Sequence, residues 1–123
     1  MGVGLGFLRK NPDTGAWEGD YELVGWGTFG ELEDLLLRKP LLFFLSDYEE
    51  DYEIDFDAPG PPYPATVKPK LAEEIEEWLS LFASSILEHL RSIPDEEVEA
   101  PARRLKSLVE RRLSEGYAVL VSY

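Results

Sequence analysis

The chain has 123 residues, with 25 acidic and 12 basic side chains, a formal net charge of −13 and no cysteine. A chain of this length forms one ordinary domain, so we expect residues 1–123 to share one core. The lack of cysteine excludes disulfides, thiolate nucleophiles and cysteine-ligated metal centres, and the acidic excess argues against a nucleic-acid partner, which needs clustered Lys and Arg.

No segment of the sequence predicts insertion into a membrane. The longest apolar run, PLLFFL at 40–45, is far too short to cross a bilayer, and the first residues lack the basic and long apolar regions of a signal peptide. We therefore expect a cytoplasmic protein with no membrane partner. The absence of Gln and Cys, together with 30% charged residues, is typical of a thermophilic protein.

The first 25 residues predict a β-hairpin. Apolar residues at positions 3, 5 and 7 alternate with glycines at 4 and 6, which places the glycines on one bare face of a strand that another element can approach closely. The sequence NPDTG at 11–15 has the composition of a tight turn, and a second strand follows it up to position 25.

The segment GWGTFG, Gly25 to Gly30, follows a predicted strand and precedes a predicted helix, as the glycine-rich loop of dinucleotide-binding folds does. An acidic residue also follows, at Asp47. Two features argue against nucleotide binding: the bulky Trp26 stands where the backbone would have to approach a phosphate, and no further βαβ units follow. We therefore expect these glycines to shape the corner between a strand and a helix. Thr28 and Glu31 form a capping-box pattern that predicts a helix from there to Pro40, and LLFFL at 41–45 fits either a short buried strand or a last helical turn.

Residues 46–69 contain the most unusual stretch. Seven of the eleven residues from 47 to 57 are Asp or Glu. Six of them, at the odd-numbered positions, alternate with rings and an isoleucine, which predicts a strand with one solvated carboxylate face. A straight strand spreads its carboxylates along a line, so we expect no specific metal site. The proline-rich residues 58–69 predict an extended connection. We expect a partner to bind Asp51, Glu53, Asp55, Asp57 and Tyr63.

The second half of the sequence is helical. Apolar residues from 71 to 93 fall on one arc of about 120° in a long helix. His89 lies within this arc, in the last turn of that helix, where packing and capping explain it. A second helix spans 101–115, where Arg112 is expected to bury its stem and reach an acid elsewhere, and a strand closes the chain at 117–123. The fold class predicted is α+β, with an antiparallel or mixed sheet of about four to five strands packed against the two helices.

These observations favour a binding or regulatory protein over an enzyme. The sequence has no cluster of catalytic residue types, and the glycine-rich segment at 25–30 is not expected to bind a cofactor. Its most distinctive property is its large net charge. We expect an inhibitor- or immunity-type protein that faces a basic protein partner, or that self-associates as a homo-oligomer. The alternative is a small nucleotide- or divalent-metal-dependent enzyme centred on Gly25–Gly30 and Asp47.

Overall fold

The hairpin expected at the N-terminus is present in the structure, a computed structural model that describes residues 2–36, 43–44 and 50–122. Strands β1 (Gly2–Lys10) and β2 (Trp17–Gly25) pair antiparallel along their whole length. In the turn between them, the Asn11 side-chain oxygen accepts the backbone N–H of Asp13 at 2.8 Å. Gly15 has a φ of +73°, a conformation that glycine adopts without steric penalty.

The strands form a sheet in the order β3-β6-β1-β2-β5-β4. Five of them are joined by antiparallel pairs, and the two-residue β3 runs parallel to β6 at the other edge. The bounds are β3 (Phe43–Phe44), β4 (Tyr52–Ile54), β5 (Tyr63–Val67) and β6 (Ala118–Ser122). The predicted α+β class is confirmed, and 43–44 of the ambiguous run LLFFL are a strand.

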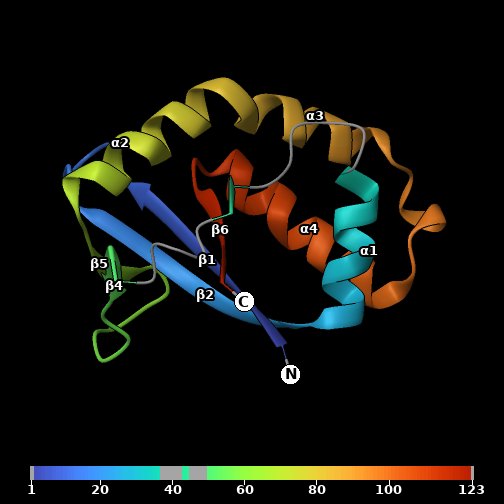
Figure 1. Cartoon of the computed structure of the whole chain (residues 1–123), viewed down its shortest axis with the longest axis horizontal. Coiled ribbons are helices and arrows are strands. Elements are labelled where there is room, and N and C mark those ends of the chain that lie inside the picture. The colour runs from blue at the N-terminus through green and yellow to red at the C-terminus, as the bar shows by residue number, and fades with distance from the viewer. Residues whose placement is uncertain (1, 37–42, 45–49, 123) are drawn as a thin grey trace.

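The helices complete the fold. Figure 1 shows a long curved helical segment spanning the molecule, with α1 and α4 packed near the end that α3 reaches. The helical elements are α1 (Trp26–Leu36), α2 (Pro69–Trp78), the π-helical turn η2 (Leu79–Ala83), α3 (Ser84–Ser92), the short 3₁₀ turn η3 (Asp95–Glu97) and α4 (Ala100–Ser114). Among the described residues, none of these helices is both long and apolar enough to cross a membrane.

The two faces of β1 have different neighbours, as its alternation predicts. Val3, Leu5 and Phe7 are buried in the main core with the apolar side chains of the helices. On the opposite face, a Cβ atom at Gly4 would collide with the ring and hydroxyl of Tyr21. A Cβ at position 6 would lie 2.9 Å from the hydroxyl oxygen of Tyr52. The bare glycine face is therefore the place where Tyr21 and Tyr52 approach the backbone of β1 closely.

The long helix is interrupted by one π-helical turn, η2, which alters the phase that the sequence predicts. At about 100° per residue, a straight helix would spread its buried residues over about 120°. One extra residue absorbed in η2 rotates α3 back by about 100°, so that the buried side chains of both halves fall within about 80°. These buried residues are Leu71, Ile75, Trp78, Ile86 and Leu90, whereas Phe82, inside η2, is only half-buried. The π-helical turn thus aligns the two halves against one core.

His89 joins α3 to α1, which refines the expected packing role. Its Nε2 atom lies 2.6 Å from the backbone oxygen of Leu35, in the last turn of α1. A carbonyl oxygen can only accept a hydrogen bond, so Nε2–H is the donor. His89 therefore connects α3 to α1 through a side-chain hydrogen bond.

Two expected elements differ in the structure. Helix α1 begins at Trp26, which places Thr28 inside its first turn, so Thr28 is not the N-cap of a capping box. Of the strand expected over 47–57, the described part is regular only in β4, and the expected proline-rich connection over 58–69 contains a further strand, β5. β5 starts after the prolines at 59, 61 and 62 and includes Pro64, whose backbone oxygen accepts the N–H of Asp55 at 2.9 Å. Residues 46–49 of the segment 46–69 lie outside the described residues.

Candidate protein-binding surface

The acidic segment contributes an edge strand to the sheet. β4 pairs with β5 on one side only and is the last strand in the order of the described sheet. Ile54 is 9% exposed and belongs to the core, and Tyr52 packs against that core. Glu53, between them, is exposed. The period-two alternation predicted for this segment is present over these three residues.

The strand then turns, which gathers carboxylates instead of spreading them along a line. The Asp55 side-chain oxygen accepts the backbone N–H of Asp57 at 3.1 Å, an Asx-type turn, and the backbone N–H of Asp55 donates to the Pro64 oxygen at 2.9 Å. As a result, Glu53, Asp55 and Asp57 line one shallow hollow of about 550 Å³ at the end of β4 and β5. No cation among the described residues forms an ion pair with any of the three.

An exposed ring stands among these carboxylates. Phe56 is 55% exposed and lines the same hollow. Its ring centroid lies 5.2 Å from that of Tyr63 and 6.4 Å from that of Tyr21, both in edge-on arrangements. Edge-to-face pairs of this kind stabilise by about 0.5–1.5 kcal/mol beyond the area they bury. The two tyrosines therefore hold Phe56 in an exposed position. We refer to Glu53, Asp55, Phe56 and Asp57 as the acidic tip.

The structure separates the five residues predicted to bind a partner into three groups. Glu53, Asp55 and Asp57 meet in the acidic tip. Tyr63 is half-buried and supports Phe56. Asp51 lies at the other end of β4, 3.6 Å from the Lys68 ammonium, so its charge is balanced within the chain. Sequence reasoning missed the turn at Asp55 that brings three of them together.

The glycine-rich segment does not form a phosphate-binding loop. β2 ends at Gly25 and α1 begins at the next residue, so Gly27 and Gly30 lie inside the helix. A Cβ atom at any of these three glycines would meet no other atom within 4 Å. β2 is also antiparallel to β1, whereas a dinucleotide-binding unit needs parallel strands. Asp47, the other residue of the alternative enzymatic hypothesis, lies outside the described residues.

Metal-ligating side chains do not converge in the described ranges. No group of three or more His, Asp or Glu there is arranged to hold a metal ion. The three carboxylates of the acidic tip line an open hollow and do not surround a point, and a divalent cation needs six or more oxygens around it.

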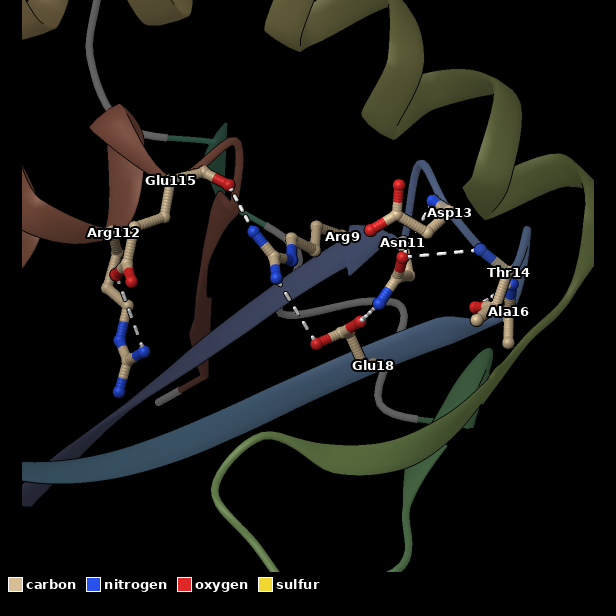
Figure 2. Close-up of polar contacts among 8 residues, drawn as sticks. All are labelled: Arg9, Asn11, Asp13, Thr14, Ala16, Glu18, Arg112 and Glu115. Atoms are coloured by element: carbon tan, nitrogen blue, oxygen red, sulfur yellow. Dashed lines mark hydrogen bonds and ion pairs between the residues drawn. The ribbon is translucent and has the colours of Figure 1, made fainter.

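A network of charges lies on the sheet near the end of α4, just before β6 begins (Figure 2). Arg9 donates to the backbone oxygen of Glu115 at 2.6 Å and to Glu18 at 3.4 Å, and Glu18 also accepts from Asn11 at 2.5 Å. Glu18 is 9% exposed, and a buried carboxylate needs such partners because its desolvation is costly. Sequence reasoning did not identify this network, because its members are far apart along the chain.

Arg112 reaches an acid on β2, as predicted. Its guanidinium lies 2.6 Å from Asp20 and 3.7 Å from Glu115, while the side chain is 12% exposed. The same guanidinium lies 5.5 Å from the centre of the Phe7 ring and 5.3 Å from that of Tyr117. Burial raises the pKa of the Tyr117 hydroxyl, although the nearby Arg9 acts to lower it. These contacts hold α4 on the sheet and are structural.

Lys106 is the most deeply buried cation described. Its side chain is 3% exposed, and its ammonium lies 3.1 Å from Asp95 and 3.0 Å from Glu110. Burial acts to lower the pKa of Lys106, but the hydrogen bonds to Glu110 and Asp95 outweigh it and raise that pKa. Its role is therefore to fix η3 against α4. The i,i+4 spacing of Lys106 and Glu110 is the one feature of the sequence that could have indicated it.

Comparisons with known proteins leave the geometry as the only guide to function. No known protein family matches the chain, and neither a characterised protein nor a solved structure shows significant similarity to it.

Proposed function

We propose that this protein is a non-enzymatic binding or regulatory module of the inhibitor or immunity type, which uses its acidic tip to bind a basic protein. The observation that supports the proposal best is Phe56, 55% exposed and surrounded by three carboxylates that no described cation pairs with. Aromatic side chains are enriched in the centre of protein interfaces. The carboxylates would steer a basic surface toward that ring.

The edge position of β4 supports the same proposal. An edge strand offers its backbone to a partner unless charge or a turn protects it. Here, Glu53 and the turn at Asp55 discourage pairing with an arbitrary strand while leaving access for a partner that carries positive charge. The tip would therefore select partners by charge as well as by shape.

The experiment compares two variants with the same change in net charge. The tip variant carries Glu53→Gln, Asp55→Asn and Asp57→Asn, so that the Asn at position 55 can keep the turn. The control variant carries Glu73→Gln, Glu76→Gln and Glu77→Gln, at three exposed positions of α2. Each protein is immobilised in equal amount and exposed to extract of the cells that make it.

The expected result is that the parent and the control retain one basic protein in stoichiometric amount, and that the tip variant loses most of it. Charges attract one another over a Debye length of about 8 Å in physiological salt, which speeds the encounter of the two proteins. Neutralising the tip should therefore lower chiefly the association rate. Equal retention by all three proteins, or no stoichiometric retention by the parent, would refute the proposal.

A further inference from the structure

The outward face of α4 carries a charge opposite to that of the rest of the chain. Residues 101–123 have a net charge of +3, whereas residues 1–100 have a net charge of −16. Arg103 donates to the backbone oxygens of Asp95 and Val98, both at 2.9 Å. The side chains of Arg104 and Arg111 are exposed and make neither a hydrogen bond nor an ion pair with any other described residue. Two guanidinium groups are thus available to an anionic partner.

These two arginines line a groove between α4 and the end of β2. The groove has a volume of about 440 Å³, enough for one aromatic side chain, and its apolar lining includes Val24, Leu105 and Leu108. Arg104, Leu108 and Arg111 are spaced i, i+4 and i+7, so they follow one stripe of the helix. Glu22 also lines the groove, which leaves an excess of one positive charge. We call this the basic groove.

The acidic tip and the basic groove are complementary. The tip presents one exposed ring among three unpaired carboxylates, and the groove presents an apolar floor between two unpaired guanidinium groups. Bidentate pairing of arginine with carboxylate is the strongest hydrogen-bonded ion pair available to side chains. We propose that a second copy of this chain is a partner of the acidic tip, with Phe56 of one copy seated in the basic groove of the next; this inference rests on the proposed function of the tip.

The two surfaces cannot meet within one chain, because they lie on opposite faces of the sheet. Tyr21 lies over the glycine face of β1 and contacts Phe56 on that side. Asp20, the preceding residue of β2, points to the other side, where it pairs with Arg112 of α4. In Figure 1, β4 and β5 lie near one end of β2, and α1 continues from its other end. The contact is therefore between molecules and head-to-tail, which generates rings or open chains.

The test uses two variants that each disable one surface. The groove variant carries Arg104→Gln and Arg111→Gln, and the tip variant is the triple substitution described above. Sedimentation velocity of the parent, of each variant and of their equimolar mixture is measured from about 10 µM to about 1 mM, a range suited to weak association. The control with substitutions at 73, 76 and 77 is run beside them.

The expected result is that the parent and the control associate as concentration rises, that each variant alone stays monomeric, and that the mixture forms a dimer that grows no further. In the mixture, the intact tip of the groove variant can bind the intact groove of the tip variant. This single contact can form only if the tip of one copy binds the groove of another. A monomeric parent, association of either variant as strong as that of the parent, or a mixture without dimers would overturn the inference. The capture experiment is independent of this result, because a monomeric parent could still retain a basic protein through the tip.

Discussion

The π-helical turn predicts that two neighbouring aromatic residues of the long helix contribute very differently to stability. Trp78 is 3% exposed, and Phe82, four residues later, is half-buried within the turn. A buried aromatic side chain removes about 200 Å² from water, worth about 5 kcal/mol at about 25 cal/mol per Å². Alanine keeps a small part of that area, so Trp78→Ala should cost about 3–5 kcal/mol. Phe82→Ala should cost about half as much.

The measurement is urea unfolding of both variants followed by far-UV circular dichroism. Equal m-values would show that the two variants expose the same surface on unfolding, so that the midpoints report stability directly. Leu81→Ala serves as the control, since Leu81 is 59% exposed and should change stability by less than about 0.5 kcal/mol. If Phe82→Ala cost as much as Trp78→Ala, the helix would be straight and the phase argument would be refuted.

Two further predictions concern the glycines of α1 and β1 and the stability of the fold at alkaline pH. Gly27→Ala should stabilise the protein by about 0.5–1 kcal/mol, because the position lies in a helix with open space around it, whereas Gly4→Ala should cost about 1–3 kcal/mol by displacing Tyr21; a destabilising Gly27→Ala in thermal unfolding would contradict this account of the corner. The pKa values of Lys106 and Tyr117 are both raised, so the folded state holds their protons to higher pH than the unfolded state does. The contribution of these two groups to the free energy of unfolding should therefore be complete below pH 10.0 and should be lost as pH rises through the raised pKa values. Lys106→Met should make the melting temperature fall less steeply above that pH. An unchanged fall would refute the role of Lys106.

Periodicity in the sequence predicted the features that depend on neighbours along the chain. The alternation of apolar residues with Gly4 and Gly6 identified a strand with one close-packed face, because sheet geometry has a strict period of two. The position of Arg112 within an apolar arc predicted a buried stem with a charged partner. The composition of the NPDTG turn predicted the hairpin.

The features that the sequence did not predict depend on contacts between distant residues. A π-helical turn cannot be read from a helical arc, because the arc is drawn by assuming about 100° per residue throughout. The gathering of Glu53, Asp55 and Asp57 depends on a turn stabilised by a hydrogen bond to Pro64 of the next strand. The basic groove depends on β2 and α4 lying side by side, and the sequence showed only a net positive charge at its C-terminal end.

The turn η2 also determines where this chain can change its length. Removing one residue inside a regular helix rotates everything beyond it by about 100° and would turn the buried face of α3 toward solvent. Removing Leu81 would instead convert the π-helical turn into α-helix and leave the residues from Ile86 to Leu90 facing the same core. The long helix can therefore lose one residue without rotating its second half only within η2. Related chains that are one residue shorter in this helix would keep the same core only if the deletion falls between 79 and 83.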